Sequence, residues 1–275
     1  MITTREFGPV TQFTMGRLFG GKPVYTMACY YVDGLLIDTG PAHVAEEIPA
    51  ALAPYPVRTV VNTHHHEDHI GNNAILQQQF GTGPALAHPL AVPRISNPAS
   101  WASRLLPYQH FAWGSPPASA AAAIPDRLTV GRHRYAVIYT PGHSDDHICL
   151  LEPDEGWLFT GDLFLSERAE VLRSDEDAGQ ILASLRRLLD YEFKTIFCGS
   201  GRVVEDGKRA LAAKVEFWEH LATEACRLRA EGREPEEIRQ ALLGEESTLY
   251  HLTGGDFGKI HLINSLLRCS CPDAA

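Results

Sequence analysis

Long apolar runs are missing from this chain of 275 residues. No stretch approaches the about 18 consecutive apolar residues that a membrane-spanning helix needs. The first ten residues, MITTREFGPV, contain neither the basic segment nor the apolar segment of a secretory signal. We therefore expect no association with a membrane and a cytoplasmic location.

Cysteine is scarce and scattered, with six residues of which only Cys269 and Cys271 lie close together. A disulfide-stapled miniature fold places its cysteines densely, and a structural zinc site usually shows Cys-x-x-Cys pairs. Neither pattern is present, so we expect reduced cysteines that serve mainly in packing.

Positive charge is also in short supply, because 24 Lys and Arg face 34 Asp and Glu for a net charge of -10. That sign opposes non-specific attraction to a phosphate backbone, which disfavours RNA as a partner without excluding it. The chain also lacks a phosphate-binding loop, a dinucleotide fingerprint and the G-x-S-x-G of serine hydrolases. A small-molecule substrate is the first expectation, and a homodimer is possible.

What the chain does contain is enough apolar sequence, 44% of residues, for a full core. Short β-branched or apolar runs predict strands, and the dipeptide Asp33-Gly34 predicts a hairpin. The strand-like runs alternate with helix-like segments, which indicates a layered α/β or α+β domain. The strand-like runs are 27–32, 35–40, 57–62, 135–139, 148–151, 157–160 and 195–198.

Two regions differ from this pattern. Residues 89–125 hold seven prolines and several aromatic residues, and are interpreted as an insertion that either covers a binding site or packs on the core or at a dimer contact. From Glu205 onward helical patterns dominate, at 207–230, 235–243 and 259–268. We therefore predict a domain over 1–204 and a C-terminal helical extension over 205–275.

Histidine is the residue in surplus, with 13 in the chain and four of them between His64 and His69. The segment Thr63–Gly71 reads THHHEDHIG and follows the predicted strand at 57–62. Imidazole and carboxylate groups together suit zinc, iron and similar divalent ions. Because residues two apart at a strand end can point the same way, His64 and His66 can share one ion. His65 and Glu67 should then point elsewhere.

Two further strand ends offer metal-ligand residues. Pro141-Gly142-His143 follows one predicted strand, and Gly161-Asp162 follows another. Three strand-to-loop junctions of this kind predict one metal site.

The combination of H-x-H-x-D-H, TPGH and TGD resembles the metallo-β-lactamase fold hydrolase superfamily, and TPGHSDDHICLLEP through FTGD is most similar to its glyoxalase II and beta-lactamase-like endoribonuclease branches. The resemblance covers roughly residues 20–205. It implies an αββα sandwich, two mixed sheets with helices outside, and a metal centre at one edge. It implies one or two divalent ions, with zinc as the first expectation and iron or manganese as alternatives.

The same resemblance assigns roles to individual residues. It implies that His64, His66 and His143 bind a first ion, that Asp162 bridges, and that Asp68 and His69 bind a second ion. Asp68 would also orient the nucleophile and serve as the catalytic carboxylate. Asp38 matches a supporting aspartate of the family, although a turn-capping role is an alternative. His147 is expected to lie near the site in a supporting or structural role.

One position departs from the family pattern. A Gly-His-Gly turn, whose histidine completes the second metal site, is expected where this chain reads Gly199-Ser200-Gly201. A neutral serine hydroxyl is a poor substitute for imidazole, so Ser200 predicts a weakened second site or a single ion. The C-terminal histidines His220, His251 and His261 are weak candidates for a replacement ligand.

These observations predict a hydrolase that uses metal-bound hydroxide on an ester, thioester, lactone or phosphodiester. Two alternatives stay open. The first is a mononuclear iron enzyme resembling the persulfide dioxygenases, which the loss of a histidine at Ser200 favours. The second is a catalytically weak metal-binding protein.

Overall fold

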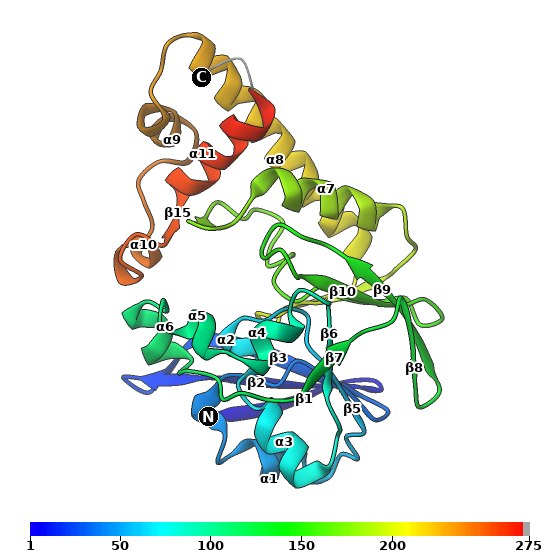
Figure 1. Cartoon of the computed structure of the whole chain (residues 1–275). Coiled ribbons are helices and arrows are strands. Elements are labelled where there is room, and N and C mark those ends of the chain that lie inside the picture. Colours follow the sequence, from blue (N-terminus) through cyan, green and yellow to red (C-terminus); the bar gives the residue numbers. More distant parts are fainter. Residues whose placement is uncertain (272–275) are drawn as a thin grey trace.

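The computed structural model describes residues 1–271. Two β-sheets face one another, and helices cover the outer face of each sheet (Figure 1). This arrangement confirms the predicted sandwich of two mixed sheets with helices outside. Among the described residues, no helix is both long and apolar enough to cross a membrane.

The first sheet has seven strands in sequence order. Its first three pairings are antiparallel, including the predicted hairpin at Asp33-Gly34, and its last three are parallel. The strands are β1 (Ile2–Phe7), β2 (Val10–Phe19), β3 (Lys22–Val32), β4 (Leu35–Ile37), β5 (Thr59–Val61), β6 (Ala85–Ala87) and β7 (Ala121–Ala123).

The second sheet has six strands in the order β14-β13-β11-β10-β9-β8, and only β11 and β13 pair in parallel. Its members are β8 (Arg127–Val130), β9 (His133–Tyr139), β10 (Ile148–Glu152), β11 (Trp157–Phe159), β13 (Thr195–Phe197) and β14 (Val203–Val204). A small separate sheet joins β12 (Leu172–Arg173) to β15 (Phe257–Gly258).

Helices come directly after β4, β5, β6, β12, β14 and β15 in the chain. They are the 3-10 helix η1 (Ala42–Val44), α1 (Ile48–Leu52), α2 (Glu67–Ile70), α3 (Asn73–Phe80), α4 (Val92–Ser96), α5 (Ala99–Ala102), α6 (Pro107–Ala112), α7 (Ala178–Leu189), α8 (Gly207–Ala230), α9 (Pro235–Leu243), α10 (Thr248–Leu252) and α11 (Lys259–Ser270). The predicted ranges 207–230 and 235–243 coincide with α8 and α9.

Alternation along the strands divides the core into layers. In β10, Ile148 and Leu150 face the opposing sheet, whereas Cys149 and Leu151 face the helices. Side chains of successive strand residues point to opposite faces, so an unbroken apolar strand must be covered on both sides. The central strands therefore have to lie in the middle of a four-layer structure.

The C-terminal helices share the apolar layer outside the second sheet. Residues of α7, α8 and α11 pack in one cluster with side chains from β9 and β10. The division of the chain at residue 205 stays a prediction, because this cluster runs across it. One sequence expectation was wrong here: Cys226 of α8 and Cys271, just after α11, form a disulfide. Their separation of 45 residues gave no local signal of the pairing.

The predicted insertion at 89–125 contains α4, α5 and α6 and ends in strand β7, which completes the first sheet. Tyr108 and Trp113 from this region line a cavity of about 580 Å³. Tyr25 of β3 packs against both rings, with centroids 6.3 and 6.0 Å away. The insertion therefore forms part of a cavity wall.

One end of the sandwich gathers the loops that carry the predicted metal ligands. The loops after β5, β9, β11 and β13 all lie there, and hydrogen bonds join them across the sheets. The N–H of Ile148 donates to Thr63 O at 2.8 Å, the N–H of Gly199 to Gly161 O at 2.7 Å, and the N–H of Ala28 to Gly199 O at 2.6 Å. These bonds fix the loops relative to one another.

Candidate metal centre

Three histidines meet at this end of the sandwich. His64 Nε2 lies 2.9 Å from His66 Nδ1 and 3.2 Å from His143 Nε2, and His66 Nδ1 lies 3.0 Å from His143 Nε2. All three side chains are buried. A tetrahedral zinc with Zn–N bonds of about 2.0–2.1 Å holds its nitrogens about 3.3 Å apart, so this triangle has nearly the size that such an ion requires.

Burial and nearby positive charges favour the neutral form of His64 and His66. Burial, reinforced by the neighbouring histidines, holds the pKa of His64 well below its usual value. Burial and the Arg173 guanidinium do the same for the pKa of His66. Neutral imidazole is the form that binds metals, because the ligating nitrogen must keep its lone pair.

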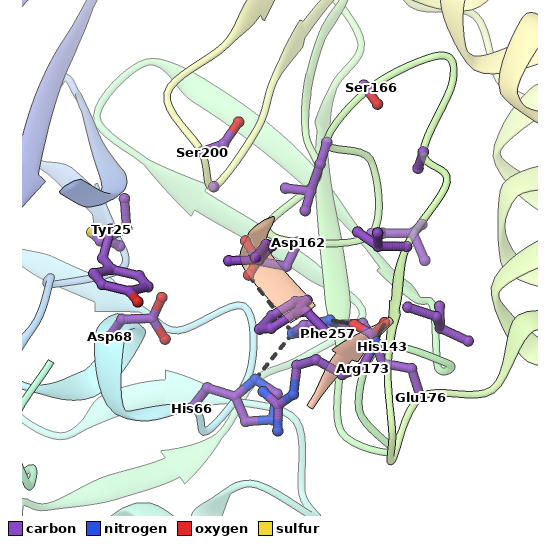
Figure 2. A pocket seen from close by; sticks show the side chains of 18 of the residues that line it. Tyr25, His66, Asp68, His143, Asp162, Ser166, Arg173, Glu176, Ser200 and Phe257 are labelled. Carbon is purple, nitrogen blue, oxygen red and sulfur yellow. Dashed lines mark hydrogen bonds and ion pairs between the residues drawn. The ribbon is translucent and has the colours of Figure 1, made fainter. Parts of the chain in front are cut away.

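His143 is held from behind by a residue that the sequence did not indicate. Its Nδ1 donates to the carboxylate of Glu176, so its Nε2 is directed at His64 and His66 (Figure 2). Burial lowers the pKa of His143, but the carboxylates of Glu176 and Asp162 outweigh that effect and raise it. Glu176 follows β12 and precedes α7, 33 residues away from its partner, and no motif surrounds it.

Asp162 lies between two groups of potential ligands. Its Oδ2 is 3.7 Å from His143 Nε2, and its Oδ1 is 3.5 Å from His69 Nε2. Burial would raise the pKa of Asp162, but His69 and the other nearby histidines hold it below its usual value. His64, His69 and Asp162 form a second set whose ligand atoms all lie within 4.8 Å of one another.

The contacts of His69 indicate whether the candidate ligands around it fit a cation. Its Nε2 is buried and has no hydrogen-bond partner within the described residues. Asp68 Oδ2 lies 3.6 Å from this nitrogen, and Asp162 Oδ1 approaches it from the other group of ligands. Buried polar atoms are almost always paired, so an orphaned imidazole nitrogen between two carboxylates fits a divalent ion.

Asp68 faces the cavity beside this second set. Burial raises its pKa to about 7, with His69 opposing that effect and Asp162 reinforcing it. Figure 2 shows the Asp68 carboxylate with the Tyr25 hydroxyl pointing toward it. Tyr25 has a positive φ of 49°, an uncommon backbone conformation for a bulky residue.

The two expected supporting residues both touch the centre. Asp38 Oδ2 accepts from His69 Nδ1 at 2.8 Å, and Asp38 also accepts from the Thr63 backbone N–H and hydroxyl. Asp38 therefore both orients a histidine and fixes the loop after β5. His147 Nε2 accepts from the Asp162 backbone N–H at 3.3 Å, and its Nδ1 lies 2.9 Å from Thr140 Oγ1.

Ser200 does not take the place of a ligand. Its Oγ lies 3.1 Å from the Cys198 sulfur, and Figure 2 shows the hydroxyl pointing away from Asp162. A Cβ at Gly199 would lie 2.0 Å from Asp162 Oδ1, so only glycine fits between Ser200 and the carboxylate. Among the described residues, the sets that could hold a metal include none of His220, His251 and His261.

His65 and Glu67 alternate with the candidate ligands along the chain, and both contact other residues, as expected. His65 turns away from the triangle, and its Nδ1 donates to Asp146 Oδ2 at 2.9 Å. Glu67 is buried and accepts from Gln109 Nε2 of α6 at 2.8 Å. The histidine-rich segment thus divides into candidate ligands and residues that anchor the surrounding loops.

A cavity of about 580 Å³ opens beside the centre. His66, Asp68, His143 and Asp162 line one side of it, together with Ser200. Its other walls are largely apolar and aromatic, formed by Tyr25, Tyr108, Trp113, Leu163, Trp218, Leu249 and Phe257. Ligand-binding sites commonly have this size and this mixture of apolar wall and few polar groups.

Comparison with known families agrees with this geometry. The model of the metallo-beta-lactamase superfamily matches residues 28–200, which include strands of both sheets and every candidate ligand. The chain belongs to the metallo-beta-lactamase superfamily. The resemblance stated from the motifs is thereby confirmed.

Several curated members of this superfamily are similar in sequence. The chain is 30% identical over 227 residues to a hydroxyacylglutathione hydrolase of Rhodospirillum rubrum, covering 81% of this chain and 76% of that protein. It is 27% identical over 195 residues to the Beta-lactamase-like protein 2 homolog of Drosophila melanogaster, covering 67% and 59%. It is 27% identical over 198 residues to an atrochrysone carboxyl ACP thioesterase of Claviceps purpurea, covering 68% and 54%. The chain thus spans little more than half the length of several of these relatives.

Solved structures of superfamily members share the fold. A metallo-beta-lactamase family protein from Thermus thermophilus superposes with a TM-score of 0.65 at 18% identity, covering 94% of this chain and 93% of that one. A metallo-beta-lactamase from Pontibacter korlensis gives 0.60 at 20% identity, covering 79% and 98%. At these identities the likeness concerns the fold alone.

Proposed function

We propose that this protein is a metal-dependent hydrolase that cleaves a carboxylic ester or thioester. The observation that carries the proposal is the triangle of three buried imidazole nitrogens, 2.9 to 3.2 Å apart, at the wall of a large apolar cavity. The curated relatives include a hydroxyacylglutathione hydrolase and an acyl carrier protein thioesterase, whose names support this class of reaction.

His64, His66 and His143 would hold the first ion, and Asp162 would bridge to a second position at Asp68 and His69. We propose zinc as the native ion, with iron or manganese as alternatives. A divalent ion bound there lowers the pKa of water to about 7 and polarises a carbonyl group. Asp38, Glu176 and His147 would keep the ligands oriented, since partners behind metal ligands fix tautomer and direction.

Asp68 is the residue placed to handle the proton of the attacking water. Its carboxylate faces the cavity, 3.6 Å from His69 Nε2, and Oδ2 can accept that proton and return it to the leaving group. The Tyr25 hydroxyl points toward the same carboxylate and can orient it (Figure 2). Both residues lie on the cavity side that the substrate must approach.

The cavity wall favours an apolar acyl group as the part that enters it. Aromatic residues from the insertion and from β3 form one side, and Leu163 and Trp218 form the other. RNA is a weaker candidate, because the chain carries a net charge of -10 and the cavity is mostly apolar. Lactones fit the same chemistry as esters and belong in the substrate panel.

A thiol-release assay tests this proposal directly. Protein loaded with zinc, iron or manganese is incubated with S-lactoylglutathione, acyl thioesters of different length and the matched esters and lactones, whose hydrolysis is followed by acid release. We expect turnover of at least one thioester, with a loss of 100-fold or more in His66→Ala. Absence of turnover on every ester, thioester and lactone with all three metals would refute the proposal.

A second candidate is an iron-dependent oxygenase that acts on a persulfide. The observation that favours it is Ser200, which stands where the family pattern expects a histidine and whose hydroxyl contacts Cys198. Oxygen uptake by the iron-loaded protein with glutathione persulfide would identify this activity. A protein that binds metal but shows neither reaction would support the third hypothesis, a metal-binding protein of weak catalytic capacity.

A further inference from the structure

A lysine with no acidic partner lies in the wall of the cavity. Lys214 belongs to α8, the long helix behind the second sheet (Figure 1), and its side chain is only 3% exposed. Within residues 1–271, Lys214 forms no ion pair. Lysine is almost never fully buried unless it is paired, so this placement requires an explanation.

The surroundings of the ammonium group satisfy it only in part. Lys214 Nζ donates to Leu163 O at 2.8 Å, which is its one hydrogen bond within the described structure. The nitrogen also lies 4.9 Å from the Trp218 ring centroid and 5.9 Å from that of Phe164. An ammonium group has three N–H donors, so two of them are left without an acceptor among the described residues.

Such an arrangement costs stability in the folded protein. Burial lowers the pKa of Lys214 to about 8, although Glu176, Cys198 and Asp162 oppose that effect from a distance. The aromatic contacts compensate the charge incompletely, because a cation over a ring gains less than desolvating an unpaired ion costs. A leucine or methionine would fill this position more stably, so packing alone does not account for the lysine.

The cavity supplies the missing partner. Leu163, whose carbonyl accepts from the ammonium group, directly follows Asp162 in the chain, and Lys214, Leu163 and Asp162 all line this cavity. We propose that Lys214 binds a carboxylate of the substrate, and that the cavity therefore takes acyl compounds which carry a carboxylate group as well as the scissile bond. This inference names a substrate class for the proposed hydrolase and rests on it.

The charge balance favours a carboxylate over a phosphate. One ammonium group neutralises one negative charge, whereas a phosphate dianion would leave one charge uncompensated in an apolar space. The other cations of the cavity are already engaged: Arg173 with Asp175 at 2.9 Å, and Lys259 with Glu170 at 3.4 Å. Arg168 is exposed and packs over Phe217.

Direct binding by calorimetry tests the assignment without requiring turnover. The probes are 4-phenylbutyrate and its neutral isostere 4-phenylbutyramide, added to the metal-loaded protein. We expect the carboxylate to bind at least 10-fold more tightly than the amide to the native protein. Lys214→Met should lose that preference, while its affinity for the amide stays within about twofold.

Lys208→Met is the matched control, because Lys208 lies on the same helix and pairs with Glu192 at the surface. It should bind both probes as the native protein does. An unchanged preference in Lys214→Met would assign the carboxylate to the metal and overturn the proposal. An equal loss of affinity for both probes would show that Lys214 serves in packing, and this result would also overturn the proposal.

Lys214→Gln provides a second neutral variant if Lys214→Met does not fold. If neither folds, the native protein alone decides: a carboxylate preference below threefold overturns the inference. A preference above 10-fold that persists in His66→Ala, where metal binding is weakened, supports it. Failure of the hydrolase assay would leave this binding result unaffected, so the two proposals fail separately.

Discussion

The carboxylate of Asp38 lies 2.8 Å from His69 Nδ1, on the side opposite to the orphaned Nε2. The Nδ1–H group must donate to this carboxylate, so the tautomer of His69 is fixed with its lone pair on Nε2. Asp38 itself has a positive φ of 60°, which is rare outside glycine. Strain of this kind persists where the surroundings enforce it, often at functional sites.

Asp38→Asn should weaken the second group of ligands more than the first. The amide of asparagine has the same shape as the carboxylate but no negative charge, so it no longer fixes the tautomer of His69. Loss of such a partner typically lowers metal affinity or activity by about 10- to 100-fold. Metal titration monitored by a competing chelator measures the change. An unaltered affinity for every bound ion would show that Asp38 only caps the loop after β5.

His143→Ala should remove most of the bound metal, because His143 is the one member of the triangle contributed by the second sheet. His65→Ala is the control. His65 lies between two proposed ligands, yet its ring contacts Asp146 instead of the triangle. Elemental analysis of the purified variants should find metal in His65→Ala and little in His143→Ala. Stoichiometric metal in His143→Ala would refute the ligand assignment.

Ser200→His should raise the number of bound ions toward two. The serine hydroxyl contacts Cys198, whereas an imidazole at this position would reach the cavity beside Asp162. Ser200→Ala removes the hydroxyl alone and should leave the metal count unchanged. Two tightly held ions in the native protein would instead show that Asp68, His69 and Asp162 suffice.

Lys214→Met should stabilise the protein at pH 7, by about 1–2 kcal/mol, because it removes an unpaired buried charge. The pKa of Lys214 is lowered to about 8 in the folded state from 10.5. Between these values the unfolded chain binds more protons, so the stability of the native protein rises with pH. The advantage of the variant should therefore be full below pH 8 and vanish near pH 10.5. Chemical denaturation across this range measures it, and a destabilised variant at pH 7 would contradict the reasoning.

Much of the fold and of the candidate site could be predicted from the sequence. The strand at residues 57–62 and the segment from His64 to His69 were both identified from local pattern. His143 and Asp162 were found because each follows a strand-like run and a turn residue. Helices α8 and α9 were predicted with the bounds that the structure shows. All of these signals depend on residues that are near one another in the chain.

The sequence by itself thus determined the candidate ligand types, their strand-end positions and a layered α/β domain, and its motifs implied the αββα sandwich through their resemblance to the superfamily. Only the tertiary structure paired Glu176 with His143, Cys226 with Cys271, and the Lys214 ammonium with Leu163 O, across 33, 45 and 51 residues. The position of a buried charged group or thiol shows no periodic pattern in the sequence. Its partner depends on how the chain folds, because folding brings residues that are distant in sequence into contact. That is why the candidate ligands and Asp38 could be predicted from the sequence, whereas Glu176 behind His143 and the buried ammonium group of Lys214 could not.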